Sequence, residues 1–205
     1  MLSRVVPLIG AVFFVGSICW RAWLHARLYG SSGIVLFRSG HKGQNIRDAL
    51  LVVLLLVVLG QAVAAAVRAE SIASLGMISW HVRATWQSIG AVVLCGGVIL
   101  VIIGQIQLGS SWRIGIEEGA RPGLVTTGLY GFSRNPIFLG MLVALAGYTL
   151  LLPTWLSLAM LLGMFIGNRQ QAVAEEAYLL RAYGDDYRAY ARQVGRFLPE
   201  VGRLR

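Results

Sequence analysis

Charged residues are scarce in this chain of 205 residues: Asp, Glu, Lys and Arg together make up 13% of it, against 57% hydrophobic residues. The mean hydropathy is correspondingly high, at +0.69. A water-soluble domain of this size could not bury so many apolar side chains in one core. The composition therefore excludes a soluble globular protein and predicts that part of the chain lies in lipid.

Cysteine and histidine are also scarce, and their spacing argues against two kinds of site. Cys19 and Cys95 both fall inside apolar runs, and no CxxC or Cys/His pattern occurs. His25, His41 and His81 pair with no cysteine or acid at metal-ligand spacing, so we expect them in loops or at the membrane interface. The sequence predicts neither a disulfide framework nor a metal site.

No proline-, serine- or charge-rich linker divides the chain, and no internal repeat is visible. We therefore predict one membrane domain over residues 1–205. Its first part, residues 1–108, is expected to hold three N-terminal spans. Residues 109–205 are expected to form the half that binds a cofactor and carries the chemistry.

Five apolar runs predict the fold, because a helix needs roughly 20 apolar residues to cross a bilayer. The last two runs are separated only by Pro153 and predict a helical hairpin. Beyond Asn168 the charge rises, so this helix should project into water until Gly184, before a short helix over 185–194. The predicted class is all-α, a polytopic bundle of about five spans with C-terminal cytoplasmic helices. The runs are 5–24 (with Arg21 near its end), 49–67, 86–108, 136–152 and 154–167.

The formal net charge of +9 comes almost entirely from arginine. These arginines sit at the ends of apolar runs, which is typical of membrane-flanking charge, so we expect a lipid bilayer as partner and no nucleic acid. The larger set falls on one side of a five-span model, which predicts a cytoplasmic C-terminus and an N-terminus outside. The membrane itself is expected to be a bacterial inner membrane. That set comprises Arg27, Arg38, Lys42, Arg47, Arg113, Arg121, Arg134 and the C-terminal arginines.

The polar connection over 109–136 is long for a link between two helices, and such loops are often functional. Pro136 suits the first turn of a helix, so Arg134 and Asn135 should lie at a helix mouth where free backbone N–H groups point outward. A helix mouth of this kind favours an anion such as a carboxylate.

Two adjacent acids, Glu175 and Glu176, follow the last apolar run by about two helical turns. They cannot face the same way, so one is expected to line a pocket and the other to meet solvent; the sequence leaves open which is which. An acid and an anion-binding helix mouth at the same membrane edge suit a zwitterion. S-adenosylmethionine carries an amino-acid zwitterion and a sulfonium, so it is one such ligand.

Several separated elements of the second half also resemble a known family. They are 128–140 (GLYGFSRNPIFLG), Glu175-Glu176, 183–190 (YGDDYRAY) and 196–199 (RFLP), with 111–115 and 124–128 upstream. In order and spacing they resemble the isoprenylcysteine carboxyl methyltransferase and phospholipid methyltransferase superfamily of integral membrane enzymes.

This resemblance implies an S-adenosylmethionine-dependent membrane methyltransferase with a lipophilic acceptor that enters from the bilayer, at the cytoplasmic face. The acceptor class stays open between an isoprenylcysteine-like group, a phospholipid amine and a thiol, and the oligomeric state is not assigned. The candidate catalytic residues are Gln171, Glu175 and Asn135. The positions that match the cofactor-binding elements are Leu124, Val125, Gly128, Tyr130, Arg134, Asn135, Pro136, Glu175 and Glu176.

Three positions depart from the family pattern. Many members have His where this chain has Asn135 and Tyr where it has Phe138, so a titratable ring and a hydroxyl are lost. Members that methylate carboxylates resemble one another in an arginine four residues before the paired acids, where this chain has Gln171. An acceptor carboxylate would thereby lose a bidentate partner, which favours an amine, thiol or neutral acceptor.

Two alternatives stay open at this point. One is a membrane reductase of the sterol-reductase kind, which would use NADPH, although no further phosphate-binding signature supports it. The other is a non-enzymatic membrane subunit whose long connection docks a partner.

Overall fold

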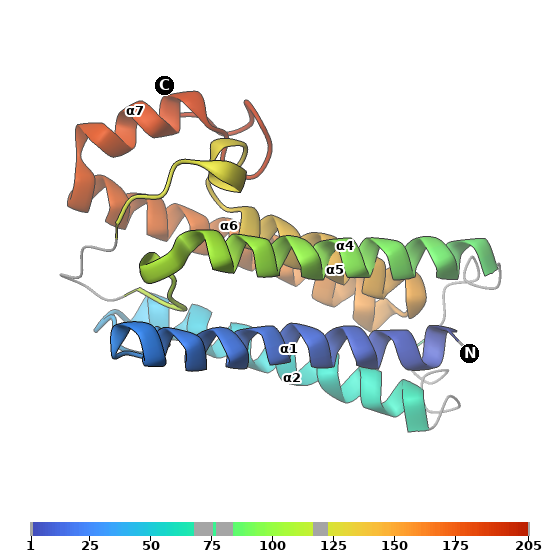
Figure 1. Ribbon diagram of the computed structural model, residues 1–205. Helices are drawn as coiled ribbons and strands as arrows, with labels where there is room; N and C mark the ends of the chain where they lie inside the picture. The colour runs from blue at the N-terminus through green and yellow to red at the C-terminus, as the bar shows by residue number, and fades with distance from the viewer. Residues whose placement is uncertain (1, 68–75, 77–83, 117–122, 205) are drawn as a thin grey trace.

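The computed structural model describes residues 2–67, 76, 84–116 and 123–204, and this part of the chain is helical (Figure 1). The long helices lie roughly parallel, and α1, α4 and α6 end at the same side of the bundle at which α2 begins, on the left in Figure 1. The elements are α1 (Leu2–Tyr29), α2 (Lys42–Val67), α4 (Ala84–Leu108), η2 (Gly109–Ser111), η3 (Gly128–Gly131), α5 (Pro136–Leu151), α6 (Trp155–Tyr183) and α7 (Asp185–Gln193).

The predicted all-α class and the order of the helices are confirmed. Within the described residues, three helices, α1, α2 and α4, are long and apolar enough to cross a membrane, whereas α5 has only 16 residues. Helix α6 starts apolar and becomes charged, and it ends at Gly184, which has φ +53°. The hairpin around Pro153 and the short helix α7 also match the prediction. The count of five spans stays a prediction.

Glycines allow α4 and α5 to pack closely. A Cβ built on Gly97 would lie 2.2 Å from the backbone nitrogen of Ala144, and one on Gly147 would lie 2.2 Å from that of Leu94. Small residues are the usual means by which membrane helices bring their backbones together. Gly104 lies close to Ile137 of α5 in the same way, whereas Gly96 has open space beside it.

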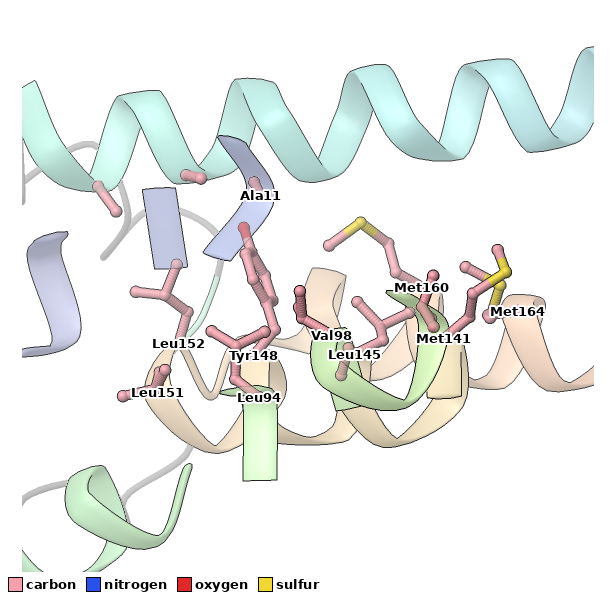
Figure 2. Packing of buried hydrophobic residues seen from close by; sticks show 14 residues of the cluster. Ala11, Leu94, Val98, Met141, Leu145, Tyr148, Leu151, Leu152, Met160 and Met164 are labelled. Carbon is pink, nitrogen blue, oxygen red and sulfur yellow. The ribbon is translucent and has the colours of Figure 1, made fainter. Parts of the chain in front are cut away.

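The apolar core lies between α2 and the α4–α5–α6 layer (Figure 2). Tyr148 points from α5 toward α2, where its hydroxyl donates to the carbonyl of Val58 and to Gln61 Oε1, at 3.0 and 3.1 Å. Gln61 in turn donates to Thr154 Oγ1 at 2.7 Å. These interhelical hydrogen bonds satisfy the buried amide of Gln61, and they attach the hairpin to α2.

Arg21, the one arginine inside an apolar run, reaches the C-terminal end of α4. Its Nε donates to the carbonyl of Gln105 at 3.1 Å and its Nη2 to that of Gly109. The guanidinium therefore satisfies carbonyls that a helix end leaves unpaired, where a cation also suits the helix dipole. His25, one turn further along α1, contacts the carbonyls of Ser31 and Ser110 at 2.6 and 3.1 Å.

The expectation that His25 lies in a loop was therefore wrong: it is a buried residue of α1 that helps to hold the end of α4, and a position at the membrane interface stays a prediction. Its sequence context gave no signal, because the partners are backbone carbonyls. His41 is exposed on the connection before α2, as expected, and His81 lies outside the described residues.

Two parallel bridges fix the connections at this polar end of the bundle. Ile34 pairs with Ile114, which joins the connection before α2 to the one after α4. Ser133 pairs with Gly195, which joins the segment before α5 to the C-terminal segment after α7. The helix ends, the long connection and α7 consequently meet in one place.

Candidate functional site

The helix mouth predicted at Pro136 is present. Asn135 is the N-cap residue of α5 and Pro136 occupies its first turn. The backbone N–H of Arg134 donates to the carbonyl of Gly195 at 3.0 Å, and Asn135 Nδ2 donates to the carbonyl of Arg196, also at 3.0 Å. The C-terminal segment therefore covers this mouth and sets the direction of the Arg134 side chain.

Glu176 lies at the centre of a buried ion-pair cluster. Arg196 donates to both of its carboxylate oxygens, from Nε at 2.7 Å and from Nη2 at 2.9 Å. Arg134 Nη2 lies 3.0 Å from Glu176 Oε1 and donates to the carbonyl of Gly202 at 2.7 Å. The side chain of Arg134 is only 1% exposed and that of Glu176 7%. The two predicted elements, helix mouth and acidic pair, are thus in direct contact.

The cluster keeps spare capacity for an anion. Two guanidinium groups share one carboxylate, so the three side chains carry one excess positive charge. Moreover, Nε and Nη1 of Arg134 are buried and have no hydrogen-bond partner among the described residues. Leaving a buried donor unpaired is costly. An anion placed beside Arg134 would balance the excess charge and pair one of these donors.

Glu175 has different surroundings from Glu176. It is half-buried, and its Oε1 accepts a hydrogen bond from Gln171 Nε2 at 2.9 Å. Burial raises the pKa of Glu175 to about 7, although the hydrogen bond from Gln171 and the charges of Arg113 and Arg47 act to lower it. A carboxyl that titrates near neutrality can accept or donate a proton, which is the property of a general base or acid.

The expectation that one of the two acids meets solvent was wrong, since neither is exposed. Glu176 is the buried one, and both of its oxygens are engaged by arginines, so it is not free to bind a cation from a ligand. Glu175 is the acid with one oxygen, Oε2, that accepts no hydrogen bond from the described residues.

Aromatic residues surround the ion-pair cluster. The Tyr190 hydroxyl donates to the carbonyl of Tyr130 at 2.6 Å, which ties α7 to η3. The guanidinium of Arg134 lies 6.0 Å from the ring centre of Tyr187, and that of Arg113 lies 5.0 Å from the ring of Tyr178. Burial raises the pKa of both Tyr130 and Tyr187 well above the ordinary value, so these phenols stay neutral.

The remaining predicted positions are placed less centrally. Leu124 and Val125 are half-buried on the connection before η3, and no contact among those described joins them to the ion-pair cluster. Gly128 begins η3 with φ +63°, and a Cβ there would meet the side chain of Gln107 at 2.8 Å. Gln107 also accepts from the N–H of Leu129, at 2.8 Å, so this glycine turn is fixed to the end of α4.

Two residues of the site, Arg196 and Arg47, were given no role in it from the sequence. Arg196 was noted as part of a motif but given no role, although the family-like run around it was a usable signal. Arg47 was counted only as membrane-flanking charge, yet its Nε donates to Gln171 Oε1 at 3.1 Å. Arg47 and Gln171 are 124 positions apart, so only the fold reveals the contact.

Comparisons with known proteins show which families the chain is similar to. Residues 86–186 match the family model described as phospholipid methyltransferase. A stretch of 113 residues is 29% identical to the protein-S-isoprenylcysteine O-methyltransferase of Schizosaccharomyces pombe and covers 53% of this chain and 47% of that protein. The chain thus spans about half the length of that curated relative.

The fold is also that of a solved structure, the eukaryotic intramembrane Ras methyltransferase known as isoprenylcysteine carboxyl methyltransferase. The TM-score is 0.57 and the sequence identity 20%, and the match covers all of this chain and 75% of the other. The apolar helices and the fold are those of an integral membrane protein, and the similar proteins are methyltransferases. The three comparisons together support the superfamily that unites isoprenylcysteine carboxyl methyltransferases and phospholipid methyltransferases.

Proposed function

We propose that this protein transfers a methyl group from S-adenosylmethionine to a lipophilic acceptor at the cytoplasmic face of the membrane. The observation that carries the proposal is the cluster of Arg134, Glu176 and Arg196, with its excess positive charge and its two unpaired donors. Arg134 and Glu176 both lie within the family-matched residues 86–186. That match favours methyl transfer over the reductase and the non-enzymatic subunit.

The residues present fit the cofactor. Its carboxylate would accept from one of the unpaired donors of Arg134, Nε or Nη1, which lie on different edges of the guanidinium. Leu124, Val125, Gly128, Tyr130, Asn135 and Pro136 are proposed to shape the surrounding pocket, and Glu175 and Glu176 to border it. When bound, S-adenosylmethionine supplies a methyl group made electrophilic by its sulfonium.

The chain's own residues would position the acceptor and exclude water, which matters more for attack on a methyl group than a strong base does. Glu175, with its pKa near 7, is placed to take the proton that an amine or thiol acceptor loses. Gln171 would orient Glu175 through their hydrogen bond. Asn135, the third catalytic candidate, donates to the carbonyl of Arg196 and thus has a positioning role.

The direct test is to incubate the purified protein with methyl-labelled S-adenosylmethionine and a total lipid extract, and then to identify the labelled product. Thermal shift with S-adenosylmethionine and with NADPH, measured separately, distinguishes the methyltransferase from the reductase. Stabilisation by NADPH alone would overturn the proposal. No binding of either cofactor and no labelled lipid would favour the non-enzymatic subunit.

Arg134→Gln is expected to weaken S-adenosylmethionine binding by about ten- to a hundredfold, because charged hydrogen bonds are lost. Isothermal titration calorimetry in detergent measures this change. Arg188→Gln is the matched control, since Arg188 is an exposed arginine paired only with Asp185. Equal affinity in the Arg134 variant and the wild type would contradict the cofactor assignment.

A further inference from the structure

The first turns of α2 make a hydrogen-bonded connection to α6 beside the proposed site. Arg47 donates from Nη2 to Gln44 Oε1 at 2.6 Å and from Nε to Gln171 Oε1 at 3.1 Å. Gln44 Nε2 also donates to Gln171 Oε1, at 3.1 Å. Gln171 Nε2 then donates to Glu175 Oε1 at 2.9 Å. An unbroken chain of contacts therefore runs from Arg47 on α2 to Glu175 on α6.

The α2 end of this chain is held rigidly. Asp48 is buried and accepts at Oδ1 from Gln44 Nε2, at 2.6 Å, and at Oδ2 from the backbone N–H of Phe37, at 2.8 Å. Because the Gln44 nitrogen is committed to Asp48 and Gln171, its Oε1 must face Arg47. The guanidinium of Arg47 is thus set in position by partners that are themselves fixed.

The charge of Arg47 is not matched by a direct ion pair in the described part of the chain. Its hydrogen-bond partners, Gln44 and Gln171, are neutral amides. A guanidinium has five N–H donors, and these two contacts use two of them. Both hydrogens on Nη1 and one on Nη2 stay available, which is enough for a bidentate contact with an oxyanion.

The position of this donor set relates it to the acceptor. Gln171 and Glu175 lie one turn apart on α6, and the next residue, Glu176, contacts Arg134 on the proposed cofactor side. Arg47 is at the opposite end of the chain of contacts, at the start of the apolar span of α2. An acceptor embedded in the bilayer would present its polar head at this level.

From this geometry, and resting on the proposed function, we propose that Arg47 binds an oxyanion at the head of the lipid acceptor, on the side of Glu175 away from the cofactor. Arg47 lies outside residues 86–186, so the family match assigns it nothing. The oxyanion is a carboxylate or a phosphate, which a guanidinium binds in the same bidentate way. The positive charge that Gln171 cannot supply would then come from α2.

The test measures lipid binding to S-adenosylmethionine-saturated protein in a neutral maltoside detergent. Three probes are compared: a long-chain fatty acid, a phosphatidic acid and a diacylglycerol, which has no charge. The wild type should bind one or both anionic probes more tightly than the neutral one, and the fatty acid and phosphatidic acid arms show which oxyanion is preferred. Arg47→Gln should weaken the preferred anionic probe by about tenfold or more and leave the diacylglycerol unchanged.

Arg47→Lys should retain part of the preference for the anionic probe, because lysine keeps the positive charge but lacks the paired N–H donors of a guanidinium. Arg38→Gln is the matched control for net charge, since Arg38 is exposed on the preceding connection. Unchanged anion binding in Arg47→Gln would overturn the proposal. An equal loss for all three probes would also overturn it, because that result would show that Arg47 only supports the structure. S-adenosylmethionine affinity, measured on the same variants, should not change, so a failure here is separable from a failure of the proposed function.

Discussion

At the scale of single residues, the site has fewer acids than arginines, so each glutamate interacts with more than one arginine. Glu176 is shared by Arg134 and Arg196, Glu175 is approached by Arg113 and Arg47, and both acids are removed from free solvent. The two carboxyl groups differ, because Glu176 has guanidinium partners at hydrogen-bond distance, whereas Glu175 accepts a hydrogen bond from the neutral amide of Gln171. Adjacent acids thereby acquire separate roles, one fixing the arginines and the other able to titrate.

The raised pKa of Glu175 makes the stability of the protein depend on pH. The unfolded chain releases this proton near the ordinary value of 4.5, while the folded protein keeps it up to about 7. The folded state binds more protons in that window, so stability should fall as the pH rises from about 4.5 to 7. The charged groups that face Glu175, namely Arg113, Arg47 and Glu176, shift its pKa without removing this window.

Melting temperatures in detergent between pH 4.5 and 8 check this prediction. Glu175→Gln, which cannot ionise, should gain stability relative to the wild type as the pH rises through the window. Glu200→Gln, which changes an exposed carboxylate paired with Arg203, should stay parallel to the wild type. A pH-independent difference between Glu175→Gln and wild type would show that folding does not raise the pKa of Glu175.

At the scale of helices, the contact between α4 and α5 depends on glycines that allow the two backbones to meet. Gly97 and Gly147 lie opposite Ala144 and Leu94. Since α5 has only 16 residues and begins at the helix mouth, its position against α4 also sets that of Arg134. The sequence does not distinguish Gly96 from Gly97, because neighbours on a helix differ only in the face they occupy.

Gly97→Ala is expected to destabilise the bundle by about 1–3 kcal/mol, because the new Cβ would overlap the Ala144 backbone. Gly96→Ala is the adjacent control: its Cβ meets nothing within 4 Å, and alanine favours a helix, so its stability should be unchanged or slightly higher. Thermal unfolding of the two purified variants in the same detergent measures the difference. Equal melting temperatures would contradict the close α4–α5 packing.

At the scale of the whole molecule, the expected division into three N-terminal spans and a catalytic half is crossed by two sets of contacts. Arg21 and His25 of α1 hold the end of α4, and Arg47 of α2 reaches Gln171 of α6. The first two helices therefore do more than complete the bundle: they fix the connection that leads to η3 and border the proposed site. The single-domain organisation stays a prediction with which these contacts agree.

The orientation of the molecule is predicted by its loop charge, which places the C-terminus and the proposed site in the cytoplasm. A fluorescent reporter fused to the C-terminus should then be bright in bacterial cells, and an alkaline phosphatase fused at the same position inactive. The same pair fused to the N-terminus should give the opposite result. Active phosphatase at the C-terminus would place the site on the other face of the membrane and contradict the predicted orientation.

The sequence by itself determined the lipid-embedded helices, their order, the hairpin at Pro153 and the two elements of the site, because hydrophobic runs, proline and glycine act locally. The family resemblance, carried by motifs at fixed spacing, was likewise readable from the chain and is confirmed by the comparisons.

Only the tertiary structure decided which charges meet. Arg196 joins Glu176 from 20 positions away, and Arg47 reaches Gln171 from 124 positions away. These pairings depend on how the helices rotate and pack against one another, and the spacing of residues along the sequence does not specify this. In the sequence, Gln171 stands where a positive charge was expected. Helix packing brings the guanidinium of Arg47 from α2 to that position.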